Sequence, residues 1–329
     1  MKPAITLKGI TKTFGQKVAV DDLNLEVPAG SLCGFIGPNG AGKTTTIRMI
    51  MSILFPDKGE VSVLGHASAM SAKDRIGYLP EERGIYRKMK VRSFLRYMGR
   101  LKEAEASSLE ARISAWLEKV GLSEVAGKPC EELSKGMQQK IQFLAAIIHQ
   151  PDLLILDEPF SGLDPMNMRL LRDLILEERR RGATIIFSTH VLTQAEELCD
   201  HLFMINNGHK VLDGSLHSIR ERTGLQIIGL EPMDDGADIQ VAASLPMVAQ
   251  AEKVGREWRL TLTEDTDPHQ AMQALVAAHQ PLRVEMYRPS LEDIFIEMVE
   301  AGARDVAERS LLRAALRVEG TGAAGGEAP

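Results

Sequence analysis

Cysteine and aromatic residues are scarce in this chain. Only three of its 329 residues are cysteine, and 5% are phenylalanine, tryptophan or tyrosine. Cys33, Cys130 and Cys199 are far apart and odd in number, so they show neither the paired spacing of a zinc site nor a disulfide framework. We therefore expect a chain that folds in a reducing cytoplasm without disulfides, with its cysteines as small buried residues.

Long hydrophobic runs are also missing. The segment His149-Gln150-Pro151-Asp152, for example, separates the apolar residues 143–148 from the apolar residues 153–156. Neither part approaches the roughly 20 apolar residues that a membrane-spanning helix needs. Residues 1–4 lead into strand-like alternation and do not resemble a signal peptide. We therefore expect any work at a membrane to depend on another chain.

An excess of basic charge is absent as well. The formal net charge is −6 at pH 7, which argues against a general nucleic-acid coat protein. The hydrophobic fraction of 44% is ordinary for a globular protein that buries a sizeable core. The length indicates about two domains.

The most informative segment that is present is Gly37-Pro38-Asn39-Gly40-Ala41-Gly42-Lys43-Thr44. It fits the phosphate-binding loop pattern G-x-x-x-x-G-K-[ST]. The pattern predicts a buried strand before it, at 31–36, and a helix after it, at 44–54. Glycines let successive N–H groups point at phosphate oxygens, and the helix N-terminus adds partial positive charge. We expect Lys43 to reach the β and γ phosphates and Thr44 to ligate magnesium; this context argues against an inert glycine turn.

A second segment with candidate functional side chains follows the apolar run 153–156. It is the carboxylate pair Asp157-Glu158, at the C-terminal end of a predicted strand. In a parallel sheet this end lies beside the phosphate loop, so Asp157 is expected to hold magnesium, directly or through water. Glu158 is then suited to act as the general base. The alternative is that the pair only caps the next helix; the phosphate loop upstream favours the functional interpretation.

The pattern of apolar residues predicts alternating strands and helices, which indicates an α/β fold with a mainly parallel sheet covered on both faces. Strands are predicted at 4–10, 22–27, 31–36, 60–64, 75–79, 152–156, 183–188 and 201–205. Helices are predicted at 44–54, 166–181 and 191–198, with a helical insertion over 90–149.

A second, smaller α+β unit is predicted to begin near residue 223. Its strands are predicted at 225–230, 247–254, 258–263 and 282–287, and its helices at 268–279 and 290–300. This order suggests a split βαβ arrangement. We expect domain limits of 1–222, with a helical subdomain at about 84–150, and 223–300. The tail 301–329 is expected to be partly disordered.

Three further segments complete the pattern: Leu133-Ser134-Lys135-Gly136-Met137-Gln138, the loop Ser161-Gly162-Leu163-Asp164, and His190 at the end of a strand. Taken alone, Ser134 is a helix N-cap and a lone histidine is usually structural. In this order, however, the segments closely resemble the ATP-binding cassette (ABC) ATPase family over about residues 4–220. The resemblance implies a P-loop NTPase ABC cassette, with a mainly parallel sheet, antiparallel β strands and a helical subdomain.

The resemblance also implies roles for individual residues. Phe14 matches the aromatic position that stacks on adenine, although a core phenylalanine is an alternative. Glu158 matches the catalytic base, His190 the γ-phosphate sensor, and Lys43 a catalytic phosphate contact. Ser134 and Gly136 match residues that bind the γ-phosphate of a nucleotide held mainly by the opposite subunit. The remaining nucleotide contacts are Gly37, Pro38, Asn39, Gly40, Ala41, Gly42, Thr44, Thr45 and Asp164, and the metal ligands are Thr44, Asp157 and Glu81.

Because the chain carries one set of each motif, two complete sites require two such chains arranged head to tail. The expected cofactors are ATP and Mg²⁺.

The chain departs from the family pattern at two places. Glu81 replaces the family's usual glutamine, which adds negative charge near the phosphates. Lys135 and Met137 replace the usual glycine and glutamine of the signature segment.

The resemblance implies an ATP-hydrolysing subunit that energises a membrane exporter through a separate permease, peripheral on the inner face of the cell membrane. The start of the helical insertion borders the groove where a permease helix docks in the family. That region carries Arg83, Arg87, Lys88, Lys90 and Arg92, although a solvated charged face explains them equally well. Residues 283–295 resemble the appended domain of one-cassette bacterial exporter ATPases, including sodium-efflux types.

Two other functions are compatible with a single cassette. One is a soluble ABC ATPase that acts on the ribosome or on nucleic acid. The net acidic charge, the single cassette and the lack of a long coiled-coil insertion argue against it. The other is a regulatory switch that binds nucleotide without hydrolysis, which Glu158 and His190 argue against. No nucleic-acid partner is expected.

Overall fold

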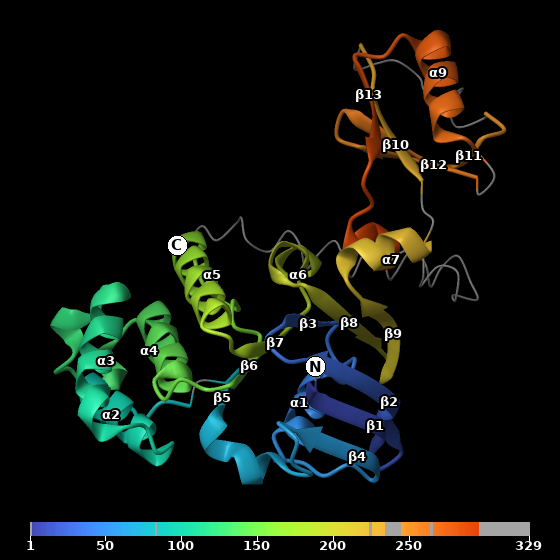
Figure 1. Cartoon of the computed structure of the whole chain (residues 1–329). Helices are drawn as coiled ribbons and strands as arrows, with labels where there is room; N and C mark the ends of the chain where they lie inside the picture. The colour runs from blue at the N-terminus through green and yellow to red at the C-terminus, as the bar shows by residue number, and fades with distance from the viewer. Residues whose placement is uncertain (1, 83, 224–225, 234–244, 264–265, 296–329) are drawn as a thin grey trace. The chain divides into compact units, whose positions relative to one another are not determined.

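The computed structural model describes residues 2–82, 84–223, 226–233, 245–263 and 266–295 (Figure 1). The chain divides into two compact units, Met1–Ser215 and Leu216–Pro329. Arg83 and the predicted tail 301–329 lie outside the described residues.

A six-stranded sheet forms the centre of the first unit. Its strands, in spatial order, are β5 (Ile76–Leu79), β6 (Leu153–Asp157), β7 (Thr184–Thr189), β3 (Leu32–Ile36), β8 (His201–Asn206) and β9 (His209–Gly214). All neighbours are parallel except β8 and β9. Every residue of β3, β6 and β7 is buried, which explains their continuous apolar sequences. The predicted mainly parallel sheet is confirmed.

The first unit also contains a three-stranded antiparallel sheet. Its order is β2 (Lys17–Pro28), β1 (Pro3–Phe14) and β4 (Lys58–Val63). The alternating apolar side chains of β1 and β2 lie on one face of this sheet. They pack with residues of α1 (Lys43–Ile50) and of the central sheet in one hydrophobic core. Alternation of buried and exposed residues along β2 matches a sheet with one face toward the core.

The segment predicted to be helical contains α2 (Val91–Leu101), α3 (Ala106–Lys119) and α4 (Lys135–Ile147), with short 3₁₀ turns at Ser123–Val125 and Cys130–Glu132. The buried faces of α2 and α4 bring Phe94 and Phe143 into the interior. Helix α4 also contacts β5, so the helical segment is anchored on the edge of the central sheet. Two further helices, α5 (Pro165–Arg180) and α6 (Leu192–Leu198), connect the sheet strands, and a 3₁₀ segment (Ala69–Arg75) leads into β5.

The second unit contains a four-stranded antiparallel sheet. Its order is β11 (Val248–Val254), β12 (Glu257–Leu262), β10 (Ile227–Glu231) and β13 (Arg283–Tyr287). Helices α7 (Leu216–Thr223) and α9 (Pro268–His279) complete the described elements, together with a helical turn at 291–295. Because β10 lies between β12 and β13, the unit β12–α9–β13 is a split βαβ unit, as predicted. Of the predicted helix 290–300, the described part is 291–295.

One local prediction was wrong, and one strand was missed. The helix expected at 44–54 ends at Ile50, because Ser52 takes a φ of 56° and the N–H groups of Ile53 and Leu54 turn back to the carbonyl of Arg48. The edge strand β9 was not predicted. It follows the turn Asn207-Gly208, whose positive φ values of 46° and 81° are those of a tight hairpin. An Asn-Gly pair is a strong hairpin signal, so the sequence did contain this information.

Candidate functional site

The loop between β3 and α1 requires glycine at two points. Gly42 precedes the first helical residue with a φ of 110°, and a Cβ placed there would lie 2.5 Å from the carbonyl oxygen of Ala19. Gly37 has a φ of 153°, and a Cβ there would lie 2.1 Å from the carbonyl oxygen of Ile205. Side chains at these positions would therefore combine backbone strain with a steric clash, and the loop can pass this close to β2 and β8 only as glycine.

Lys43 is the first residue of α1, and its side chain folds back over the loop. Its ammonium group donates hydrogen bonds to the carbonyl oxygens of Gly37 (2.6 Å) and Pro38 (3.2 Å). The ammonium nitrogen also lies 3.8 Å from Oε1 of Glu158. The residue is only 6% exposed, so its charge is concentrated inside the loop.

Asp157 ends β6 and is 1% exposed. Its Oδ1 accepts hydrogen bonds from the hydroxyls of Ser188 (2.5 Å) and Thr44 (3.4 Å). Its Oδ2 is buried and has no hydrogen-bond partner among the described residues. A buried carboxylate oxygen without a partner is costly, so this atom is suited to bind a cation.

The donor set fits Mg²⁺. Thr44 and Asp157 offer the hydroxyl and carboxylate oxygens that this ion prefers. Within the described residues, no group of three or more His, Cys, Asp or Glu side chains is arranged to hold a metal on its own. Mg²⁺ usually needs only one or two carboxylates together with phosphate oxygens and water. Glu81, the third predicted ligand, lines the same cavity as Thr44.

Glu158 follows β6 with a left-handed backbone, at a φ of 48°. Its Oε1 lies 3.0 Å from Nδ1 of His190, which follows the end of β7. Burial raises the pKa of Glu158 above its ordinary value, while the hydrogen bond and charge of His190 and the charge of Lys43 oppose this rise. A carboxylate with a raised pKa is a better proton acceptor near neutral pH.

A cavity of about 400 Å³ brings most of these groups together. Its lining contains Phe14, Lys17, Ala19, Asn39, Gly40, Gly42, Lys43, Thr44, Thr45, Glu81, Glu158, Ser161 and His190. Phe14 lies at the end of β1 and is 48% exposed, so the alternative of a core phenylalanine is wrong. The ammonium of Lys12 lies 5.7 Å from the centroid of the ring. The volume and the exposed ring suit a ligand with a flat base and a charged tail.

Six of the predicted nucleotide contacts do not line this cavity: Gly37, Pro38 and Ala41, which belong to the loop between β3 and α1, and Ser134, Gly136 and Asp164. The Ser134 side chain caps α4 by accepting from the N–H of Met137 (3.3 Å), and Asp164 caps α5 by accepting from the N–H of Asn167 (2.9 Å). A Cβ on Gly136 would lie 3.1 Å from Nδ2 of Asn167, so the N-termini of α4 and α5 are neighbours. Within one chain the predicted site residues therefore form two groups.

Sequence reasoning missed three residues near the chemistry. Lys17 and Ala19 of β2 line the cavity, but neither belongs to a recognisable pattern. Ser188 contacts both carboxylate residues, Asp157 and Glu158. Its position at the carboxyl end of a buried strand, two residues before His190, is the one signal that could have found it.

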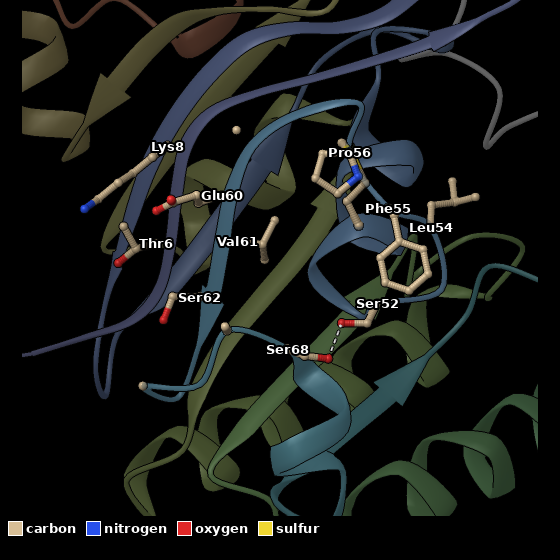
Figure 2. Close-up of a pocket in the computed structure, with 14 residues that line it drawn as sticks. Thr6, Lys8, Ser52, Leu54, Phe55, Pro56, Glu60, Val61, Ser62 and Ser68 are labelled. Carbon is tan, nitrogen blue, oxygen red and sulfur yellow. Dashed lines mark hydrogen bonds between the residues drawn. The ribbon is translucent and has the colours of Figure 1, made fainter.

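A larger cavity, of about 710 Å³, lies away from this site. Figure 2 shows Leu54, Phe55 and Pro56 on one side of it and the polar side chains of β1 and β4, such as Lys8 and Glu60, on the other. None of the predicted site residues lines it. Phe55 is 70% exposed, so this region presents an apolar side chain to solvent.

Across the described ranges of the chain, no helix combines the length and the apolar character that crossing a membrane requires.

Comparison with known proteins gives matches to both units. The family model described as "ABC transporter" matches residues 20–161, and the one described as "ATP-binding protein DrrA1-3-like, C-terminal domain" matches residues 214–299. The chain is 40% identical over 297 residues to the uncharacterized ABC transporter ATP-binding protein YhaQ of Bacillus subtilis (strain 168), covering 90% of this chain and 99% of that protein.

Two further similarities agree with these. The chain is 33% identical over 306 residues to the Nod factor export ATP-binding protein I of Sinorhizobium fredii (strain NBRC 101917 / NGR234), covering 92% of this chain and 88% of that protein. A solved structure of an ATP-binding subunit of an ABC transporter aligns with a TM-score of 0.63 and 30% identity, covering 67% of this chain and 93% of that one.

Proposed function

The chain belongs to the family of ABC transporter ATP-binding proteins. From this premise we propose how it binds ATP, how it dimerises with a second chain and where it contacts its permease. Its cassette is an ATPase whose activity is coupled to transport. The proposal has three parts: an Mg-ATP site in the cavity beside the phosphate loop, a head-to-tail pair of chains, and export through a separate membrane subunit.

We place the adenine of ATP against Phe14 and the triphosphate in the loop that ends at Lys43. The observation that supports the position of the triphosphate is that one carboxylate lies close to two basic groups on the cavity wall. Oε1 of Glu158 is 3.0 Å from Nδ1 of His190 and 3.8 Å from Nζ of Lys43. A water molecule polarised by Glu158 would attack the γ-phosphate, with Lys43 and His190 stabilising the charge that develops.

Thr44 and Asp157 would hold Mg²⁺, and Glu81 would approach it from the cavity wall. When bound, the ion neutralises charge on the β and γ phosphates. The unpartnered Oδ2 of Asp157 supports this placement. Gly37, Gly40 and Gly42 provide a backbone that leaves N–H groups available to the phosphates.

A second chain would complete each site. Ser134 is exposed at the N-terminus of α4, outside the cavity of its own chain. A helix N-terminus with a serine hydroxyl is suited to an anion. We therefore assign Ser134 and Gly136, with Asp164 at the start of α5, to the nucleotide held by the opposite chain, in a head-to-tail dimer.

We propose that the permease docks at the start of the helical segment. Tyr86 and Tyr97 are exposed, and their rings contact each other edge to face at 5.6 Å. Leu101, at the end of α2, is exposed as well, and the neighbouring Lys102 donates a hydrogen bond to the carbonyl of Lys73 (2.5 Å). This contact joins the end of α2 to the 3₁₀ segment Ala69–Arg75, which carries the exposed side chain of Met70.

One basic residue of this region is paired with a carboxylate, and three others are exposed. Arg92 is paired with Glu110, while Arg87, Lys88 and Lys90 are exposed. Large exposed apolar side chains are typical of interaction surfaces, so we base the docking proposal on them and not on the basic residues. The chain would be held through the permease at the cytoplasmic side of the membrane.

Export is the direction that the relatives favour. One relative reported above is named for Nod factor export, and residues 214–299 match a C-terminal domain named for DrrA1-3-like ATP-binding proteins. We therefore propose an exporter ATPase whose cargo is still to be identified. No observation on this chain favours a ribosomal, nucleic-acid or regulatory role.

Purification of the tagged full chain from detergent extracts of its own cells tests this function. We expect a multi-span membrane protein to co-purify and ATP hydrolysis to depend on Mg²⁺. Co-purification of ribosomal RNA in place of a membrane protein would overturn the transport role.

A further inference from the structure

Ser188 uses one hydroxyl group to contact two consecutive residues of the active site. It is fully buried in β7, directly opposite Asp157 in the register of the parallel pair β6–β7. Its hydroxyl donates a hydrogen bond to Oδ1 of Asp157 (2.5 Å) and accepts one from the N–H of Glu158 (3.1 Å). Both the donor and an acceptor position of the hydroxyl are therefore in use.

The first contact distinguishes the two oxygens of Asp157. Oδ1 is held by Ser188, with a longer contact from Thr44, and Oδ2 is left buried without a partner among the described residues. Without the Ser188 hydroxyl, the plane of the carboxylate would turn at little cost, because the terminal torsion of aspartate is broad. The hydrogen bond to a charged acceptor, by contrast, is a strong one.

The second contact supports a strained backbone. Glu158 has a φ of 48°, a left-handed conformation that is unfavourable for a residue with a side chain. Its N–H is directed at both the carbonyl oxygen of Ser188 (3.2 Å) and the Ser188 hydroxyl. These two acceptors fix the peptide between Asp157 and Glu158, so the Glu158 side chain turns toward His190 and Lys43.

We propose that Ser188 is a positioning residue for ATP hydrolysis. It holds the Asp157 carboxylate in the orientation that leaves Oδ2 for the metal, and it holds Glu158 in the backbone conformation that places the Glu158 carboxylate beside His190 and Lys43. This inference depends on the proposed roles of Asp157 and Glu158. The neighbouring hydroxyl cannot substitute for it, because Thr189 bonds Gln194 and the N–H of Val191.

Three substitutions in the full-length chain test the proposal. Ser188→Thr retains the hydroxyl, and Ser188→Val has nearly the same shape as threonine without it. Thr184→Val is the matched control: this buried hydroxyl lies at the other end of β7 and accepts from the N–H of Gly30 (2.9 Å), away from the site. Thermal unfolding of each variant identifies a temperature at which all are folded.

The main readout is equilibrium binding of ATP, by calorimetry, with excess Mg²⁺ and again with EDTA. We expect Ser188→Val to weaken binding about tenfold with Mg²⁺, the factor expected for one charge-assisted hydrogen bond, and to leave binding in EDTA nearly unchanged. Ser188→Thr should restore the Mg²⁺ effect. Thr184→Val should match the parent in both conditions while it unfolds at a lower temperature. In steady-state assays, Ser188→Val should lower kcat more than it raises KM.

Two negative results are distinguishable. If the parent binds ATP more tightly with Mg²⁺ but Ser188→Val shows the same Mg²⁺ effect as Ser188→Thr, the positioning role is wrong and the proposed function stands. If the parent itself binds no ATP under either condition, the proposed function fails, and this inference fails with it.

Discussion

His190 and Glu158 are joined across two neighbouring parallel strands: Nδ1 of the histidine lies 3.0 Å from Oε1 of the carboxylate. The same oxygen is 3.8 Å from the ammonium of Lys43, so one carboxylate connects the phosphate loop to the end of β7. A nucleotide in the adjoining cavity would meet all three groups at once. The first two of the following predictions each remove one member of this arrangement.

Replacement Glu158→Gln should retain ATP binding and lose most hydrolysis. The amide keeps the size of the side chain but cannot accept a proton from water, and general bases contribute roughly 10²–10⁴-fold to rates. Phosphate release under single-turnover conditions measures the loss. Glu197→Gln is a suitable control, because Glu197 is an exposed surface residue paired only with Arg172 on the described surface. Hydrolysis by Glu158→Gln at the parent rate would show that another group is the base.

Replacement Lys43→Ala should weaken ATP affinity and slow turnover. The ammonium is nearly buried and lies inside the loop, so its loss removes the charge nearest the phosphates. We expect binding to fall by about tenfold or more, as for the loss of a charge-assisted hydrogen bond. Calorimetry with Mg-ATP checks this, with Lys119→Ala as the control on the exposed surface of α3. Unchanged affinity would contradict the assignment of the loop.

Replacement Ser134→Ala should reduce ATP-dependent dimerisation. In the Glu158→Gln background, which should accumulate ATP-bound dimers, light scattering gives the dimer fraction with and without Mg-ATP. The lost N-cap costs about 1 kcal/mol of stability by itself. Asp267→Ala removes a comparable cap, at the start of α9, where the side chain accepts from the N–H of His269 (2.9 Å). A dimer fraction reduced equally by both variants would indicate lost stability and not a lost contact with the opposite nucleotide.

His149 should make the protein less stable in mild acid. Burial lowers the pKa of His149 to about 4, and the positive charges of Lys102 and Arg181 add to this effect. The carbonyl of Ile76, which contacts Nε2 at 3.2 Å, and the charge of Asp74 oppose it.

The sign of the pH effect follows from this depressed pKa. The unfolded chain binds a proton at His149 as the pH falls through about 6.5, whereas the native chain does so only near 4. The contribution of neutral His149 is therefore fully present above pH 6.5 and is lost progressively between about pH 6.5 and 4. Thermal unfolding from pH 7 to 5 should show a smaller decrease in Tm for His149→Gln than for the parent. Equal slopes would refute the prediction; exposed His217, replaced by Gln, is the control.

Several features of the fold follow directly from local sequence. The glycines of 37–42 determine a loop that no other residue type could form at Gly37 and Gly42, and the apolar runs at 153–156 and 185–187 determine strands buried on both faces. One cavity is lined by Phe14, Glu81, Glu158 and His190, four residues that the motifs along the chain predicted to belong to one site.

The chain's sequence alone determined the phosphate loop, the strand types and the identity of the chemical groups, because these depend on backbone preferences and periodicity over a few residues. Tertiary structure decided which groups meet. The pairing of Asp157 with Ser188 depends on the register of two strands that are distant in sequence, and no local pattern encodes that register. The separation of Ser134 from the cavity likewise arises from the packing of α4 against its neighbours. Long-range contacts of this kind form only when the whole core closes, so they must be read from the folded chain.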